Sequence, residues 1–279
     1  MHHVIKYLTV LALFAPCLAL RAQTGRTLSE AVTPVARSSR AFPEANSEGV
    51  VAERNSSAVI LRITDSDLKT CNIPRLCAPL RSVKWAGHDD PSISVKPEQE
   101  YWIIKWNKRP QGADTILLQF GGTPLLPEEI VHITSQPDGS YLLPAHFAKA
   151  TGEKVRYEPQ SYKNTVGYWV GPEDNATWKL DVEKSGSFNV AILQGCGTGQ
   201  GGSDAKLSTM HSGAKEAYTA LDFQILETGH FQNFQWRTLG TIDLEAGTQT
   251  LKIQPIRIAN KALMDVRAVH LIRLPEPKK

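Results

Sequence analysis

The chain lacks the patterns that mark several common enzyme classes. Its 279 residues contain no GxSxG nucleophile elbow, no glycine-rich loop ending in Lys-Ser or Lys-Thr, and no Cys-x-x-Cys metal motif. Long helical periodicity is also missing, and "AHFAKATGEK" is one short helical turn at best. These absences exclude an α/β barrel, which needs alternating strands and helices.

Excess charge of one sign is equally scarce. The formal net charge is +3, and no long run of Lys and Arg occurs. Removal of residues 1–22 would take away Lys6 and Arg21 and leave +1. Because phosphate binding needs a dense basic face, this balance argues against nucleic acid as the main partner.

Cysteine is limited to four residues, of which Cys17 lies in the first apolar run. The segment "CNIPRLC" holds Cys71 and Cys77, which we expect to lie close enough for a disulfide after export. Cys196 would then stay reduced as a small buried side chain.

The first residues, "MHHVIKYLTVLALFAPCLALRAQ", have a basic Lys6, a short apolar run and the small Ala22. This pattern predicts a secretory signal peptide over residues 1–22, with an uncleaved anchor as the alternative. We therefore expect a secreted or periplasmic protein. No other run approaches the ~20 apolar residues of a transmembrane helix.

The remaining chain reads almost entirely as strands. Runs such as "AVILRI", "EYWIIKW", "ATWKLDV" and "SFNVAIL" are rich in β-branched and aromatic residues and are bounded by Pro, Gly and Asp. The pattern predicts an all-β chain with two antiparallel β-sandwich domains over residues 58–153 and 154–274. Residues 23–57, rich in Ser, Ala, Arg and Pro, read as a flexible linker, and 275–279 as a tail.

The connection "QGCGTGQGGS" carries five glycines in ten residues. It is typical of a flexible hairpin loop with left-handed residues. It would equally let a backbone approach a ligand closely, and the sequence leaves both interpretations open.

Two long blocks resemble known modules. The stretch from "NTVGYWVGPEDNATWKLDV" to "QGCGTGQGGSDAKLS", with "ETGHFQNFQWRTLGTIDL" to "LMDVRAVHLI", resembles galactose-binding-like jelly-roll carbohydrate-binding modules. Such modules occur beside secreted bacterial sulfatases and α-L-fucosidase-like proteins. The preceding block "RSVKWAGHDDPSISVKPEQEYWIIKW" more weakly resembles the C-terminal β-sandwich of α-L-fucosidases.

The resemblance implies the accessory part of such enzymes without their catalytic barrel. We therefore expect a secreted, non-catalytic protein that binds a fucosylated or sulfated polysaccharide, near a secreted glycoside hydrolase or sulfatase. One alternative is an α-L-fucosidase-like hydrolase, which needs two facing carboxylates, one with a raised pKa. The other is a structural sandwich that contacts a protein.

The stretch "ETGHFQNF" combines histidine, aromatic rings and side-chain amides. Catalysis by His230 would need a nucleophile or metal partner that the sequence does not name. In a structural role, Phe231 and Phe234 would fill the core while Gln232 and Asn233 fix backbone groups. In a sugar platform, rings would stack on C–H faces and amides would bind hydroxyls.

Other aromatic residues compete for the platform role. Trp169 stands beside a Gly-Pro turn and is the better candidate for exposure, whereas Trp178 alternates with core residues. Tyr162 and Trp236 are further options. The expected carbohydrate-binding residues are Trp169, His230, Gln232, Asn233 and Trp236.

The resemblance also implies a structural calcium ion, held by one carboxylate on the first strand of the module and another on the last. Here "VRYEPQ" offers Glu158 and "LMDVRAV" offers Asp265. Calcium prefers such hard oxygen ligands. Alternatively, Asp265 pairs with Arg267 or Lys261 or stays solvated.

Overall fold

The computed structural model describes residues 38–89, 92–214 and 216–276. The expected signal peptide lies outside these ranges. Within them the chain is all-β with antiparallel sheets, as predicted, and helix is limited to three short 3₁₀ turns. These turns are η1 (Pro43–Ala45), η2 (Pro127–Glu129) and η3 (Ala145–Phe147). No helix in the described part is long and apolar enough to cross a membrane.

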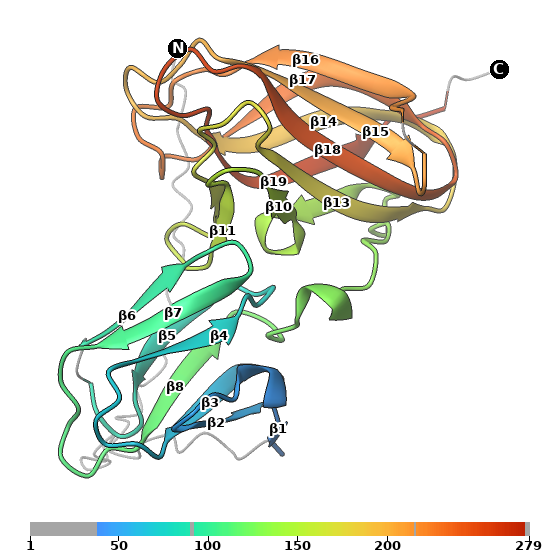
Figure 1. Ribbon diagram of the computed structural model, residues 1–279. Helices are drawn as coiled ribbons and strands as arrows, with labels where there is room; N and C mark the ends of the chain where they lie inside the picture. The colour runs from blue at the N-terminus through green and yellow to red at the C-terminus, as the bar shows by residue number, and fades with distance from the viewer. Residues whose placement is uncertain (1–37, 90–91, 215, 277–279) are drawn as a thin grey trace, which may run out of the picture. The chain divides into compact units, whose positions relative to one another are not determined.

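The first eight strands form a sandwich, here called the first sandwich (Figure 1). They are β1 (Arg40–Ala41), β2 (Val50–Arg54), β3 (Ala58–Ile63), β4 (Thr70–Pro74), β5 (Leu80–Trp85), β6 (Ile93–Pro97), β7 (Tyr101–Trp106) and β8 (Thr115–Phe120). One sheet has the order β1-β2-β3-β8-β5 and the other β4-β7-β6. Alternation on β7 buries Trp102, Ile104 and Trp106 between the sheets, and Trp106 meets Trp85 edge to face at 5.6 Å.

The structure corrects the second part of the expected linker over residues 23–57, whose residues 23–37 lie outside the described ranges. Residues 40–54 form β1, η1 and β2, and Phe42 is completely buried in the core. The buried Arg54 lies over the Phe42 ring, 4.6 Å from its centroid, and forms an ion pair with Glu129. The composition of this segment is polar, but Val50 and Ala52 fall on the inward-facing positions of β2.

The remaining strands form the second sandwich. They are β9 (Tyr141–Pro144), β10 (Lys149–Thr151), β11 (Arg156–Glu158), β12 (Thr165–Gly167), β13 (Asn175–Val182), β14 (Gly186–Gly195), β15 (Asp204–His211), β16 (Thr219–Gln224), β17 (Gln235–Leu244), β18 (Gly247–Arg257) and β19 (Asp265–Arg273). One sheet has the order β10-β13-β18-β15-β16, and the other β11-β12-β19-β14-β17, with β9 also paired to β19.

From β13 to β19 the chain passes back and forth between these two sheets, as in a jelly roll, and only β15 and β16 follow each other in one sheet. β13, β15, β16 and β18 belong to the five-stranded sheet, and β14, β17 and β19 belong to the six-stranded one. Figure 1 shows the two sheets as layers, with the five-stranded sheet in front. Trp178 and Leu180 of β13 are buried between them, which confirms the predicted core position of Trp178.

Strand pairing in the second sandwich begins before the predicted boundary at residues 153–154, because β9 and β10 already pair with its strands. Backbone hydrogen bonds also join the two sandwiches, from Leu80 to Pro159 (2.7 Å) and from Ser161 to Leu80 (3.0 Å). Whether the sandwiches fold independently at this boundary stays a prediction.

The expected Cys71–Cys77 disulfide is not formed. Both thiols are free and buried, as is that of Cys196. Cys71 shares the inward face of β4 with Ile73, whereas Cys77 lies beyond the strand end, where its sulfur accepts a hydrogen bond from Arg75 (3.2 Å). Burial raises the pKa of Cys71 to about 11.

The position of Phe42 gives a first test of the fold. Phe42→Ala should lower the free energy of unfolding by about 3–5 kcal/mol, because it leaves a cavity in the core. The exposed Glu44→Ala, two residues away, should change it by less than about 0.5 kcal/mol. Urea unfolding followed by tryptophan fluorescence measures both. Equal, small effects would mean that residues 40–54 are a linker.

Candidate functional site

A small pocket of about 250 Å³ lies in the second sandwich, where residues 158–170, 231–232 and 262–265 meet. Eight residues line it, and we call it the Tyr168 pocket: Glu158, Lys163, Tyr168, Val170, Phe231, Gln232, Ala262 and Asp265. Its volume lies below the 300–1,000 Å³ typical of sites for drug-sized ligands. It therefore suits one small ring rather than an extended ligand.

Tyr168 borders this pocket in an unusual backbone conformation. Its φ of 62° lies in the left-handed region, which costs a residue other than glycine about 1–3 kcal/mol. The guanidinium of Arg156 lies over the ring, 3.5 Å from its centroid, and fixes the ring by a cation–π contact. The side chain nevertheless stays 42% exposed, so that an aromatic surface is available to a ligand.

The loop that carries Tyr168 is held by one buried carboxylate. Asp174 accepts hydrogen bonds from the backbone N–H groups of Val170 (2.7 Å), Gly171 (2.9 Å) and Glu153 (2.6 Å). Bonds to an ionised acceptor are stronger than neutral ones. They define the backbone just after Tyr168 and so stabilise its strained conformation.

The opposite aromatic group, Phe231, is seated on the glycine-rich connection. A Cβ atom on Gly195 would lie 1.9 Å from the carbonyl oxygen of Phe231, and one on Gly197 would lie 2.9 Å from its ring. Only glycine fits at these two positions. The glycines thus allow a close approach to their backbone, but the group that approaches is the loop of Phe231 and not a ligand. Gly199 and Gly202 have positive φ, as the hairpin interpretation expects.

Of the expected platform residues in "HFQNFQW", only Gln232 lines the pocket. Asn233 donates from its amide to the carbonyl of Thr228, and His230 accepts from the backbone N–H of Gln232 (3.1 Å). Both therefore fix their own turn. Phe231 and Phe234 are only half-buried, so neither fills the core.

The structure corrects the expectation for Trp169. This side chain is completely buried, and its Nε1 donates to the carbonyl of Val166 (2.9 Å), so it presents no face to a ligand. The left-handed backbone at Tyr168 sends Tyr168 outward and Trp169 inward. Trp236 is 51% exposed on β17, beside His270 and not in the Tyr168 pocket.

The two expected metal ligands do come together. A Cβ atom on Gly167 would lie 2.7 Å from Oδ1 of Asp265 and 2.8 Å from Oε2 of Glu158, so both carboxylates converge on this glycine. Asp265 is 6% and Glu158 4% exposed. Lys163 forms an ion pair with Glu158.

Asp265 is left without a hydrogen-bond donor among the described residues. Arg267, its expected partner, instead donates to the carbonyls of Tyr162 and Lys163 and lies over the Phe234 ring. Burial, and then the neighbouring Glu158 carboxylate, raise the pKa of Asp265 well above its usual value. A buried, unpaired carboxylate beside a second one favours a bound cation.

The pair fits a calcium ion in charge and in ligand chemistry. Glu158 and Asp265 would supply two of its six to eight oxygen ligands. No cluster of three or more His, Cys, Asp or Glu side chains suited to a metal occurs in the described ranges. Any remaining ligands would therefore be carbonyl oxygens or water.

Tyr168, Phe231 and Lys163 were not predicted as site residues. For Phe231 the signal was present, because it stands between His230 and the amides Gln232 and Asn233, and the glycines near it leave room for it. No sequence pattern predicts the left-handed backbone conformation of Tyr168. The role of Lys163 could be recognised only from the structure, which places Glu158 and Asp265 together.

No protein-family model matches the chain, and no curated protein matches its sequence. Among solved structures, a family 35 carbohydrate binding module from Clostridium thermocellum is 14% identical over 48% of this chain and 98% of its own, with a TM-score of 0.36. The GH26-CBM35 β-(1,4)-mannanase of Podospora anserina is 18% identical over 50% of this chain and 29% of its own (TM-score 0.37).

The α-L-fucosidase from Vibrio sp. strain EJY3 is 11% identical over 84% of this chain and 41% of its own, with a TM-score of 0.31. The chain therefore spans less than half the length of the two enzymes. All three TM-scores lie below 0.5, and the fold described above rests on strand pairing alone.

The close packing of Phe231 against Gly197 can be tested by adding one methyl group to the glycine. Gly197→Ala should displace the Phe231 ring and lower the free energy of unfolding by about 1–3 kcal/mol through overpacking. Gly122→Ala is the matched control, because its Cβ would meet nothing within 4 Å. Chemical denaturation of both variants measures the difference, and equal stabilities would contradict the close approach.

The carboxylate pair predicts a dependence on pH and calcium. Because the folded-state pKa of Asp265 is raised, its ionisation opposes folding as the pH rises above about 4. In EDTA at pH 8, Asp265→Asn should therefore stabilise the protein by about 1–3 kcal/mol. Calcium should raise the melting temperature of the wild type and not that of the variant.

The exposed Asp89→Asn serves as control, because its side chain lies in solvent at the surface of the first sandwich. It should change neither the pH profile nor the response to calcium. A loss of stability in Asp265→Asn without calcium would show that the carboxylate is stabilised by a hydrogen-bond donor in the protein and needs no cation.

Proposed function

We propose that the chain is a non-catalytic carbohydrate-binding protein and that the Tyr168 pocket holds the sugar. The observation that carries the proposal is that two aromatic side chains, Tyr168 and Phe231, line the same small pocket together with polar groups. Sugar rings offer apolar C–H faces to such rings, and their hydroxyls bind amides and charged groups. Gln232, Lys163 and the carboxylates supply those partners.

The apolar walls of the pocket favour a fucosylated glycan. Val170 and Ala262 line it beside the two aromatic rings, and the methyl group of fucose suits such walls. Charge does not decide between the two expected ligands, because the two carboxylates and one ammonium group of the lining give a net negative charge that a calcium ion held there would reverse.

Calcium belongs to the same proposal. Held by Glu158 and Asp265, it would neutralise the buried charge and lock β11 and β19 together beneath the pocket. In this role the ion is structural, and the residues that meet the sugar are the aromatic and amide side chains above it.

A specific observation favours a second candidate, a glycoside hydrolase. The Tyr168 pocket contains two adjacent carboxylates, and the pKa of Asp265 is raised, as a catalytic acid requires. Against it stand the burial of both carboxylates, which are only 4% (Glu158) and 6% (Asp265) exposed, and the ion pair that engages Glu158 with Lys163.

The setting of the protein is likewise proposed. A secreted or periplasmic location follows from the signal-like N-terminus, and a secreted glycoside hydrolase or sulfatase is the partner that the resemblance implies. If the protein bound no glycan, the alternative of a structural sandwich that contacts another protein would be favoured.

Binding should be measurable by isothermal titration with 2′-fucosyllactose, with lactose as the comparison. We expect a dissociation constant of about 10–1000 µM, since a shallow and wet site gains little net energy per contact. Tyr168→Ala should weaken binding by about tenfold or more, because stacking on the ring is lost. Tyr162→Ala, which removes a 65% exposed ring outside the pocket, should leave it unchanged.

Three outcomes would contradict the proposal. Equal affinity for lactose would exclude recognition of the fucose, and an unchanged Tyr168→Ala variant would place the site elsewhere. Release of free fucose that stops in Asp265→Asn would show that the pocket is catalytic.

A further inference from the structure

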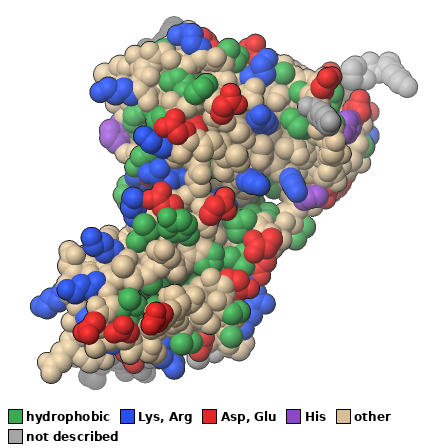
Figure 2. All heavy atoms as spheres, in the orientation of Figure 1, with side chains coloured by type: hydrophobic (Ala, Val, Ile, Leu, Met, Phe, Trp, Pro, Cys, Tyr) green, Lys and Arg blue, Asp and Glu red, His purple; other side chains and the backbone are tan. Residues whose placement is uncertain are grey.

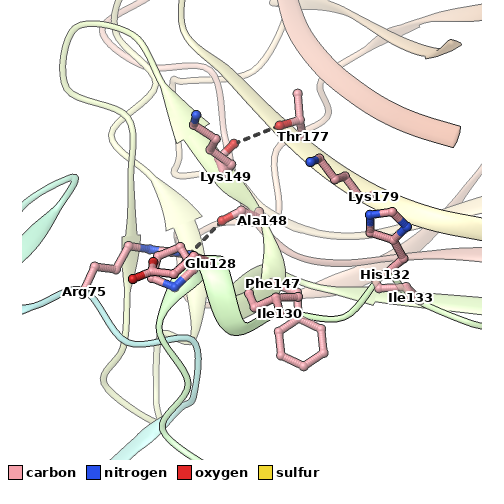
Figure 3. Close-up of a pocket in the computed structure, with 11 residues that line it drawn as sticks. Arg75, Glu128, Ile130, His132, Ile133, Phe147, Ala148, Lys149, Thr177 and Lys179 are labelled. Atoms are coloured by element: carbon pink, nitrogen blue, oxygen red, sulfur yellow. Dashed lines mark hydrogen bonds between the residues drawn. The ribbon is translucent and has the colours of Figure 1, made fainter. Parts of the chain in front are cut away.

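A second and larger pocket, of about 370 Å³, lies where β10 and β13 meet the segment of residues 127–133. We call it the Lys179 pocket. Figure 3 shows its construction: Lys149, Thr177 and Lys179 lie along one side, and the apolar side chains of Ile130 and Phe147 lie along the other. It shares no residue with the Tyr168 pocket.

The strand register places the polar groups of this pocket side by side. Lys149 of β10 is the direct cross-strand partner of Thr177 on β13, and Lys179 follows two residues later on the same face. The intervening Trp178 points the other way and is buried. Neither lysine forms an ion pair within the described ranges, so two ammonium groups share this face without a counter-charge.

Arg75 adds a third positive charge. Its side chain is buried, and its guanidinium donates to the carbonyls of Ala148 (2.7 Å) and His146 (3.3 Å), while its Nε has no partner. Carbonyl groups satisfy its donors but do not neutralise its charge. Glu128 is the only carboxylate that lines the pocket, so the lining carries a net positive charge at neutral pH.

The positive charge continues across the exposed face of the sheet. Thr177 pairs with Lys252 on β18, which in turn pairs with Ser208 on β15. No described residue forms an ion pair with Lys252. The carboxylates on this face are already engaged, Asp181 with His132 (2.9 Å) and Asp222 with Lys206 (2.8 Å). Figure 2 shows basic side chains along the β10–β13 edge of this sheet.

We propose that the Lys179 pocket binds the oxyanion of an acidic polysaccharide, a sulfate ester or a carboxylate, with Lys149 and Lys179 as its ligands. The hydroxyl of Thr177 donates to the carbonyl of Lys149 (3.4 Å) and so ties the two strands together at this point, and Lys252 meets the next charged group along the polymer. Ile130 and Phe147 contact the C–H face of the sugar that carries the anion. The identification of the ligand as a polysaccharide rests on the proposed function, whereas the affinity of the pocket for an anion rests on its lysines alone.

The division of charge separates this site from the Tyr168 pocket. The Tyr168 pocket carries two carboxylates that would hold a cation, whereas the Lys179 pocket carries ammonium groups that attract an oxyanion over about a Debye length of 8–10 Å at ordinary ionic strength. One chain can thus hold a neutral sugar and an acidic sugar of the same polymer at two sites. Binding at two sites would raise the overall affinity by effective concentration.

The test uses dextran sulfate, its uncharged parent dextran, and polygalacturonate, a carboxylated polymer with a different backbone. We expect affinity electrophoresis and titration to show binding to at least one of the two anionic polymers, falling as salt is added, and none to dextran. Lys149→Gln/Lys179→Gln should weaken this binding by about tenfold or more. Both side chains are exposed, so the double variant should fold normally, which its melting temperature checks.

Lys105→Gln/Lys108→Gln is the matched control, a loss of the same two charges from exposed positions in the first sandwich. It should weaken binding by less than twofold. An equal loss in this variant would mean that only the overall charge matters, and an unchanged double variant would place the anion elsewhere; either overturns the proposal, as does a failure of both anionic polymers to bind.

Tyr168→Ala keeps the two proposals distinct. It should abolish binding of 2′-fucosyllactose and leave binding of the anionic polymer intact. If it abolished both, the anion would be bound in the Tyr168 pocket, and the site at Lys149 and Lys179 would be refuted. Preference for dextran sulfate or for polygalacturonate identifies the anion as sulfate or carboxylate.

Discussion

The hydrogen bonds that Asp174 accepts determine most of what surrounds the candidate sugar site. Burial of a carboxylate costs several kcal/mol, and three backbone N–H donors at 2.6–2.9 Å offset that cost. They join the turn after β10 to the loop after β12, so the first residues of the second sandwich and the ring of Tyr168 are placed by one side chain. The strained tyrosine persists because this loop has no freedom to relax.

Charge, rather than shape, distinguishes the two pockets of the second sandwich. One contains a pair of buried carboxylates that converge on Gly167, and the other is lined by lysines that have no counter-ion. Such a separation is compatible with a polymer that carries both neutral and acidic units. A single mixed pocket would pair its own charges internally and would have little left for a ligand.

Much of the architecture could be predicted from the alternation of apolar and polar residues along the strands: Trp178, for example, stands between Thr177 and Lys179 and is buried. The start of the first sandwich was missed, since only a few apolar residues such as Phe42 mark it. Glu158 and Asp265 were anticipated by resemblance and are adjacent in space. Trp169 was misplaced because its position beside the Gly-Pro turn suggested exposure, whereas the side chain is completely buried next to a Tyr168 whose positive φ no local sequence pattern signals.

The free, buried thiols make the unfolding of each sandwich measurable. Burial raises the pKa of Cys71 and of Cys196 to about 11, so at neutral pH neither reacts readily with an alkylating reagent in the native state. Cys71 lies in the first sandwich and Cys196 in the second. The alkylation rate of each thiol therefore reports how often its own sandwich opens. Equal dependence of the two rates on weak denaturant would mean that the sandwiches unfold in one step, and different dependence that they unfold in two.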